Sequence, residues 1–214
     1  MIRINPSVAS ADPLAIRESL RRLGKTPLLH VDIEDGNFVF NITFGLRAVR
    51  ELARLAPAPL DAHLLVTNPG AYLADLAACG MAAAAVHYEA ADYPLDLLGT
   101  IRKAGMRAGL ALNFKTPAEA LEPFAPALDY VIIMTAEPDA GGMRFHPPML
   151  EKIARARTIL PERVEVWADG GIGEAETPLV AEAGADTAVV GRAVWEAADP
   201  AAACRALAGG AGEK

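Results

Sequence analysis

Ser7-Val8-Ala9-Ser10-Ala11-Asp12 is the stretch that chooses between two folds, because it follows the first predicted strand, Ile2–Ser7. Doubly wound parallel sheets that bind nucleotides carry a glycine-rich turn after that strand, where the backbone approaches a pyrophosphate. This stretch contains no glycine. The sequence therefore favours the other parallel arrangement, a sheet closed into a barrel.

The rest of the chain alternates short apolar runs with longer segments of helical period. The runs that read as strands are Ile2–Ser7, Leu28–Ile33, Leu60–Val66, Ala82–His87, Arg107–Asn113, Tyr130–Met134, Arg163–Asp169 and Thr187–Gly191. Helices are expected between them, for example at Pro13–Leu23, Pro69–Ala78, Pro94–Ala104, Pro117–Phe124 and Pro148–Leu160. Eight strands that alternate with helices predict an α/β protein, a single (β/α)8 TIM barrel over residues 1–214.

The composition restricts the partners and the compartment. The chain has 27 acidic and 20 basic residues and a formal net charge of -7, whereas nucleic acid or an anionic membrane would require a basic patch. The segment Met1–Pro6 reads as a strand and not as an apolar leader. Cys79 and Cys204 form no short-spaced ligand pair. We expect a cytoplasmic protein that binds neither nucleic acid nor a membrane.

Polar residues recur two apart at the ends of the first four predicted strands. These pairs are Asn5 and Ser7, His30 and Asp32, Asp61 and His63, and His87 and Glu89. Residues two apart on a strand share a face, so inward-facing pairs would meet at the carboxyl-terminal rim, where barrel enzymes place their sites. Asp169 joins them from the seventh strand. Two histidines and two carboxylates could hold one divalent metal ion (Zn, Fe, Mn or Co), and the alternative is a buried polar network without metal.

Glycines follow the last three predicted strands. Gly141-Gly142 follows the sixth, Asp169-Gly170-Gly171-Ile172-Gly173 ends the seventh, and Gly191-Arg192 ends the eighth. Glycines let backbone N–H groups approach a phosphate, and arginine adds a permanently charged donor. Barrels often bind phosphate after strands seven and eight, so we expect a phosphorylated small molecule there.

The motifs on these strand ends resemble those of the ribulose-phosphate 3-epimerase family over nearly the whole chain. The segments that carry the resemblance are Pro6–Asp12, His30–Val39 with Asn41-Ile42-Thr43, Asp61–Val66, His87-Tyr88-Glu89, Ala111-Leu112-Asn113, Met134-Thr135, Pro138 with Gly141-Gly142 and Phe145, and Asp169–Ile172. The resemblance implies a barrel of the ribulose-phosphate-binding type. It also implies a sugar phosphate as the small-molecule partner, and we expect a homo-oligomer.

The resemblance also assigns roles to residues. His30, Asp32, His63 and Asp169 would bind the metal, and Asp32 and Asp169 would double as the acid/base pair. Ser7, His63 and Met134 would contact the substrate, with Gly141, Gly142, Gly170, Gly171, Gly191 and Arg192 at its phosphate. Inverting a carbon beside a carbonyl requires one proton removed from one face and another delivered to the opposite face, through an enediolate. The implied reaction is metal-dependent interconversion of D-ribulose 5-phosphate and D-xylulose 5-phosphate.

Several positions depart from the family's pattern. Glu34 and Leu65 stand where methionines usually pack against the reacting carbons, Phe114 stands where proline is usual, and Met143 stands where glutamine is usual. Gly191-Arg192 replaces Gly-Ser or Gly-Thr and, with Asp199-Pro200, resembles the phosphate-binding end of the orotidine-monophosphate decarboxylase superfamily. These changes leave the exact ketose phosphate open.

Two other functions stay open on the sequence. One is a metal-assisted aldolase or decarboxylase that forms the same intermediate but breaks a C–C bond. The other is a sugar-phosphate-binding protein without turnover. The retained pair Asp32 and Asp169 speaks against mere binding, because binding needs no second proton donor.

Overall fold

The structure is a computed structural model that describes residues 1–138 and 144–209, and in these two segments eight strands form one parallel sheet. The strands are Arg3–Pro6 (β1), Leu29–Glu34 (β2), Leu60–Leu65 (β3), Ala83–His87 (β4), Arg107–Leu112 (β5), Tyr130–Met134 (β6), Glu165–Asp169 (β7) and Thr187–Val190 (β8). Their order in the sheet is β1-β8-β7-β6-β5-β4-β3-β2. The ring is completed by an isolated parallel bridge between Ser7 and His30, which joins the end of β1 to the start of β2. The predicted (β/α)8 barrel is confirmed.

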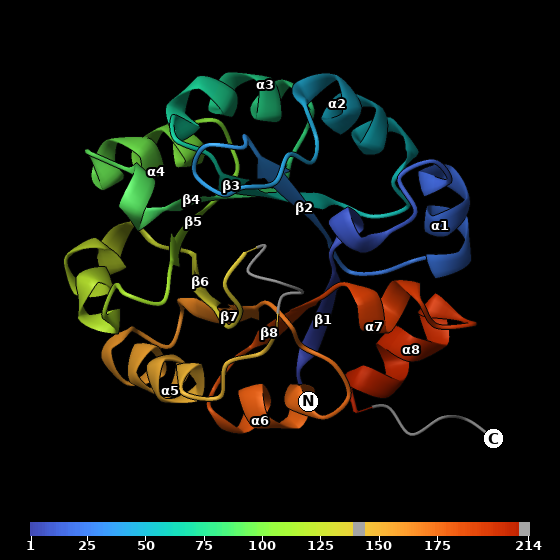
Figure 1. Cartoon of the computed structure of the whole chain (residues 1–214). Coiled ribbons are helices and arrows are strands. Elements are labelled where there is room, and N and C mark those ends of the chain that lie inside the picture. The colour runs from blue at the N-terminus through green and yellow to red at the C-terminus, as the bar shows by residue number, and fades with distance from the viewer. Residues whose placement is uncertain (139–143, 210–214) are drawn as a thin grey trace.

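Helices form the outer layer and enclose the strands (Figure 1). The α-helices are Ile16–Leu23 (α1), Leu46–Leu55 (α2), Leu73–Ala78 (α3), Pro94–Lys103 (α4), Met149–Ile159 (α5), Glu176–Glu182 (α6), Arg192–Trp195 (α7) and Pro200–Leu207 (α8). Short 3-10 helices are Val8–Ser10 (η1), Pro69–Tyr72 (η2), Tyr88–Ala90 (η3) and Ala118–Ala127 (η4). Among the described residues, no helix is both long and apolar enough to span a bilayer.

One predicted helix has a different geometry. The segment Pro117–Phe124, predicted to be helical, belongs to the 3-10 helix η4, which contains Pro123 and Pro126. Proline has no backbone N–H and its ring collides with the preceding turn, so an α-helical ladder cannot continue through these positions. Similarly, the predicted helix Pro69–Ala78 begins with the 3-10 turn η2 before α3.

Two apolar layers hold the barrel together. The larger layer lies between strands and helices, with fully buried side chains such as Leu64, Val86 and Ile101. The smaller layer fills the barrel interior, where Tyr130 of β6 stacks on Trp167 of β7 with ring centroids 4.3 Å apart. These large rings fit because β5 offers Gly109, whose hypothetical Cβ would lie 2.4 Å from the Tyr130 ring. The large ring of Tyr130 is thus matched by a residue without a side chain at the paired position of the neighbouring strand.

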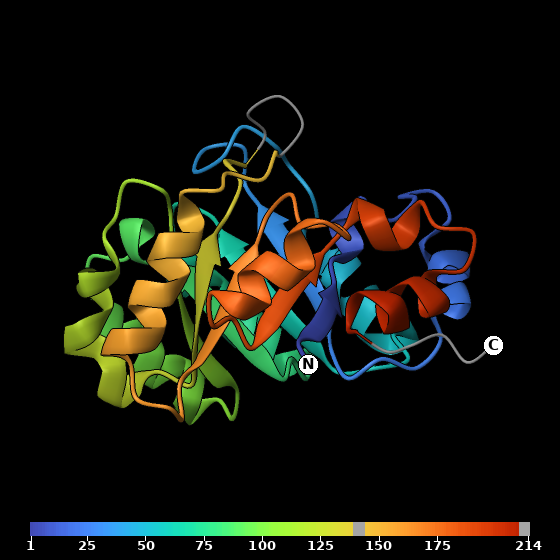
Figure 2. The ribbon, with the colours of Figure 1, turned by 90° about the horizontal axis from the view of Figure 1, so that it is seen from below.

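The strand register brings the predicted site residues to one end of the barrel. His30 of β2 is paired with Asp61 of β3, and Asp32 is paired with His63. Because paired residues of parallel strands point to the same face, all four face the interior. Figure 2 shows the barrel from the side, with the connection between β2 and α2 rising above the end where the strands finish.

Candidate metal centre and active site

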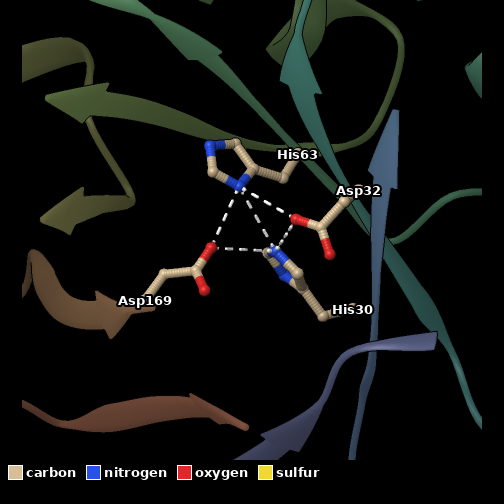
Figure 3. Close-up of side chains that lie close together, drawn as sticks. All are labelled: His30, Asp32, His63 and Asp169. Carbon is tan, nitrogen blue, oxygen red and sulfur yellow. Dashed lines mark hydrogen bonds and ion pairs between the residues drawn. The ribbon is translucent and has the colours of Figure 1, made fainter. Parts of the chain in front are cut away.

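Four side chains from three strands converge on one point at the carboxyl-terminal end of the barrel (Figure 3). His30 and Asp32 come from β2, His63 from β3 and Asp169 from β7. His30 Nε2 lies 3.1 Å from Asp32 Oδ1, 3.4 Å from Asp169 Oδ2 and 3.4 Å from His63 Nδ1. His63 Nδ1 lies 3.1 Å from Asp169 Oδ2 and 3.3 Å from Asp32 Oδ1.

This spacing suits a single metal ion. A tetrahedron with metal–ligand distances of about 2.1 Å has edges of about 3.4 Å, close to the five distances above. All four ligand atoms lie within 4.8 Å of one another, the two carboxylate oxygens included. Two imidazole nitrogens and two carboxylate oxygens are donors for which Zn, Fe, Mn and Co compete. The four residues that the sequence analysis proposed as ligands therefore form a cluster that could hold a divalent cation.

The charge of the cluster also favours a cation. Burial alone would lower the pKa of His30, but the negative charges of Asp61 and Asp32 outweigh it and raise that pKa well above its usual value. Burial alone would raise the pKa of Asp32, but His30 and His63 outweigh it and hold that pKa well below its usual range. The pKa of Asp169 is likewise lowered, against burial, by hydrogen bonds from the same two histidines. Each histidine thus lies in a field of carboxylates that stabilises positive charge at the centre of the cluster.

A second carboxylate orients His30 from behind. Nδ1 of His30 lies 2.6 Å from Oδ2 of Asp61, which is fully buried. The side chain of Asn5 donates to the other oxygen of Asp61 at 2.7 Å. With its Nδ1–H directed at Asp61, His30 keeps Nε2 as the nitrogen that would bind a cation, in exchange for the proton that the surrounding carboxylates otherwise hold there.

A second histidine lies behind His63. Nε2 of His63 lies 2.9 Å from Nε2 of His87 on β4, and Nδ1 of His87 lies 3.3 Å from Oε2 of Glu89. Burial lowers the pKa of His87 to about 4, so its ring is neutral near pH 7. Burial would raise the pKa of Glu89, but hydrogen bonds from His87 and Thr116 lower it to about 2, so Glu89 is a carboxylate.

A cavity of about 370 Å³ opens above the cluster. Asp32 and Asp169 line it, whereas His30 and His63, the second of which was also predicted to contact substrate, are fully buried and are not among its lining residues. Ser7 and Met134, predicted to contact substrate, also line the cavity, and Ser7 donates from Oγ to Oδ2 of Asp32 at 2.5 Å. The two carboxylates therefore face both the ligand cluster and the space a substrate would fill.

The predicted phosphate residues line the same cavity. Gly170, Gly171, Gly191 and Arg192 are among its lining residues, whereas Gly141 and Gly142 lie outside the described residues. A Cβ on Gly191 would lie 2.2 Å from Oγ of Ser10, so only glycine fits beside η1. Nε1 of Trp195 donates to the backbone oxygen of Ser7 at 2.6 Å and fixes α7, which begins at Arg192, against the end of β1.

The departures from the family's pattern fall in different places. Glu34, Leu65 and Arg192 line the cavity. Phe114 lies in a neighbouring depression, where its ring stacks on His146 with centroids 5.1 Å apart. Met143 lies outside the described residues. Three of the five departures, Glu34, Leu65 and Arg192, therefore lie at the cavity above the cluster.

The residue-by-residue reading of the sequence missed two polar residues that follow β2. Oγ1 of Thr43 donates to the backbone oxygen of Asp32 and accepts from the N–H of Glu34 at 3.1 Å. Asn41 donates to Oε2 of Glu34 at 2.8 Å, and both Asn41 and Thr43 line the cavity. Their presence in the motif Asn41-Ile42-Thr43 was a signal for them, but neither stands at a strand end.

Comparison with known structures supports the fold. Orotidine 5'-phosphate decarboxylase from Pyrococcus horikoshii superposes with a TM-score of 0.66 at 17% identity, covering 95% of this chain and 96% of that one. Thiamine phosphate pyrophosphorylase from Pyrococcus furiosus superposes with a TM-score of 0.65 at 18% identity, covering 96% and 93%. At these identities the likeness concerns the barrel alone.

Sequence comparison is more specific. A ribulose-phosphate 3-epimerase of Mycobacterium tuberculosis is 37% identical over 95% of this chain and 90% of its own length. The cytoplasmic isoform of Oryza sativa is 37% identical over 96% and 92%, and the Bacillus subtilis enzyme is 34% identical over 93% and 94%. The model of the ribulose-phosphate 3 epimerase family matches residues 3–195, which include every proposed ligand. With its barrel, its His/Asp cluster and these relatives, the chain belongs to the ribulose-phosphate 3-epimerase family.

Proposed function

We propose that this protein interconverts D-ribulose 5-phosphate and D-xylulose 5-phosphate by inverting C3. The observation that carries the proposal is the placement of Asp32 and Asp169, which come from β2 and β7 and line one cavity. Figure 3 shows the two carboxylates on either side of the paired imidazoles. A substrate seated between them would have one carboxylate near each face of its reacting carbon.

The reaction consists of two proton transfers. One carboxylate removes the proton from C3, and the electrons of the C–H bond form a C2–C3 double bond as the carbonyl oxygen takes up negative charge. The other residue, in its acid form, then delivers a proton to the opposite face of C3 and the carbonyl is restored. Solvent exchange returns both aspartates to their starting states. Ser7, through its 2.5 Å bond to Asp32, holds that carboxylate in position.

The proposed cofactor is one divalent metal ion, Zn, Fe, Mn or Co, held by His30, Asp32, His63 and Asp169. When bound, such an ion supplies positive charge next to the substrate oxygens on which negative charge develops. The five ligand-to-ligand distances of 3.1–3.4 Å and the carboxylate-rich field of the cluster support this assignment.

The phosphate is proposed to bind at the other part of the cavity. Gly170, Gly171 and Gly191 expose backbone there, and Arg192 lines the same space. Gly170 and Gly171 both have positive φ values, 120° and 68°, which side chains other than glycine rarely adopt. A cytoplasmic location is also part of the proposal, supported by the free thiols of Cys79 and Cys204, and the expected homo-oligomer stays a prediction.

A panel of ketose phosphates, assayed in deuterated water with each candidate metal, tests the function. An epimerase interconverts the C3 epimers and incorporates deuterium at C3. A lyase would yield fragments, and a binding protein would do neither, so either result would contradict the proposal. Turnover of another ketose phosphate in preference to ribulose 5-phosphate would keep the chemistry and reassign the substrate, as Glu34 and Leu65 in the cavity allow.

A further inference from the structure

Behind the ligand His63 runs a chain of buried polar groups with no part in the proton transfers proposed above. It consists of His63, His87 and Glu89, named here the histidine–glutamate chain. His63 and His87 are fully buried. The links are 2.9 Å between the two Nε2 atoms and 3.3 Å between Nδ1 of His87 and Oε2 of Glu89.

The two rings lie nearly parallel to each other. Their planes differ by 17° and their centroids are 4.9 Å apart, while their Nε2 atoms approach to 2.9 Å. A separation of 2.9 Å between two ring nitrogens is a hydrogen-bond distance and is too short for two lone pairs or two N–H groups to face each other. The contact is therefore a directed hydrogen bond, with one nitrogen as donor and the other as acceptor.

Only one assignment of protons satisfies every link when Nδ1 of His63 binds a cation. Nε2 of His63 then carries the hydrogen and donates to Nε2 of His87. Nδ1 of the neutral His87 ring carries the second hydrogen and donates to Glu89. The other oxygen of Glu89 accepts from the backbone N–H of Asn113 at 2.8 Å and from the hydroxyl of Thr116.

The surroundings keep this chain in place. The ring of Phe38, from the connection after β2, covers His87 with centroids 4.8 Å apart. Nζ of Lys152 on α5 donates to the backbone oxygen of Asn113 at 2.5 Å and so fixes the strand end that holds Glu89. His87 thereby receives packing from one side and an anchored carboxylate from the other.

We propose that His87 and Glu89 are positioning residues for the metal: they hold His63 in the tautomer and orientation that direct Nδ1 at the cation. This inference rests on the metal site of the proposed function. His30 is oriented directly by a carboxylate, that of Asp61, which lies next to its Nδ1. His63 is connected to its carboxylate, Glu89, through a second imidazole, because β4 places His87 and not a carboxylate beside it.

Metal affinity of the purified protein tests the proposal. We expect His87→Leu and Glu89→Gln to raise the dissociation constant for Zn²⁺ or Co²⁺ by about 10- to 100-fold, the usual cost of losing a partner of a metal-bound histidine. His87→Gln should keep much of the affinity that His87→Leu loses, because the glutamine amide can accept a hydrogen bond from His63 and donate one to Glu89. The visible absorption of the Co²⁺ form should change in the first two variants and less in the third.

Asp129→Asn is the matched control. Glu89 accepts the backbone N–H of Asn113, just after the end of β5, and Asp129 likewise accepts that of Ala108, near the start of β5, at 2.8 Å. Asp129 immediately precedes β6 and so lies at the opposite end of the strands from the ligand cluster. It should lower thermal stability and leave metal affinity unchanged. Unchanged affinity in Glu89→Gln, or an equal loss in Asp129→Asn, would overturn the positioning role even if His87→Leu does not fold. The titration uses no sugar phosphate, so its failure is separable from failure of the wild-type ketose assay.

Discussion

Nε2 of His30 and Nδ1 of His63 lie 3.4 Å apart, each with its other ring nitrogen hydrogen-bonded to a group behind it. Two nitrogen atoms that both present lone pairs at this distance repel each other unless a proton or a cation lies between them. The carboxylates of Asp32 and Asp169 complete the set of donors. The arrangement is thus organised around a positive charge at its centre.

Removal of either histidine should therefore remove the metal. We expect His30→Ala and His63→Ala to abolish metal binding and nearly all epimerase activity while the barrel still folds. Elemental analysis and circular dichroism of the purified variants check both parts. Full metal occupancy in both variants would exclude the four-ligand site.

Loss of either carboxylate should stop inversion. Asp32→Asn and Asp169→Asn should each lower turnover by roughly 10²–10⁴-fold, the usual contribution of a positioned acid or base. Each variant retains one competent carboxylate, so exchange of the C3 proton with solvent should persist on one face without net inversion. Nuclear magnetic resonance in deuterated water distinguishes exchange from inversion, and inversion at the wild-type rate would contradict the two-base assignment.

Arg192→Ala should weaken binding of phosphorylated substrates specifically. A charge-assisted contact to phosphate contributes roughly 1.5–3 kcal/mol, which corresponds to about 10- to 150-fold in affinity. KM for the ketose phosphate should rise by this factor, while activity on the dephosphorylated ketose should not change. Equal effects on both substrates would show that Arg192 does not bind the phosphate.

Gly109→Ala tests the packing of the barrel interior. The added Cβ would lie 2.4 Å from the ring of Tyr130, so either the ring or the strand must move. We expect a loss of about 1–3 kcal/mol in the free energy of unfolding, measured by urea denaturation. Gly99→Ala is the control, because nothing lies within 4 Å of its Cβ and α4 should gain roughly 0.5–1 kcal/mol.

Glu165 should stabilise the protein in a pH-dependent way. Burial alone would raise its pKa, but hydrogen bonds from Arg107 and Trp167 and the charge of Arg3 lower that pKa below its usual value of 4.5. A lowered pKa in the folded state contributes stability above pH 4.5 that is lost as the pH falls through the folded value.

Glu165→Gln should therefore cost about 1–2 kcal/mol near neutral pH, a discounted value because both arginines are about half exposed. Urea unfolding of wild type and variant should give curves whose difference shrinks as the pH is lowered below 4.5. A difference that stays constant with pH would mean that the charge of Glu165 contributes nothing.

The sequence predicted the strands well because each is a short apolar run between helical segments. The spacing of two residues between His30 and Asp32 also predicted that they share one face of their strand. The register of β2 and β3 places Asp61 and His63 beside them. What spacing could not predict is the direction of each ring. That Nε2 of His63 faces His87 depends on side-chain torsions set by packing, as does the contact of Phe38 with His87.

Segments without a strong period were harder to predict. The prolines of η4 convert an apparent helix into 3-10 geometry, and they act through the missing N–H and not through hydrophobic pattern. Thr43 reaches Asp32 from a connecting segment whose path depends on the fold around it. Loop positions of this kind acquire their roles only once the barrel holds them.

The contact between β1 and β2 has the fewest backbone pairings among the neighbouring strands described, and the proposed site lies across it. In the described part of the chain seven neighbouring strand pairs share ladders, whereas β1 and β2 meet at the single bridge between Ser7 and His30. The side chain of Ser7 crosses that contact to reach Asp32. A ligand that immobilises Asp32 should therefore also stabilise the contact between β1 and β2. Binding at the site and the thermal stability of the barrel are coupled in this way.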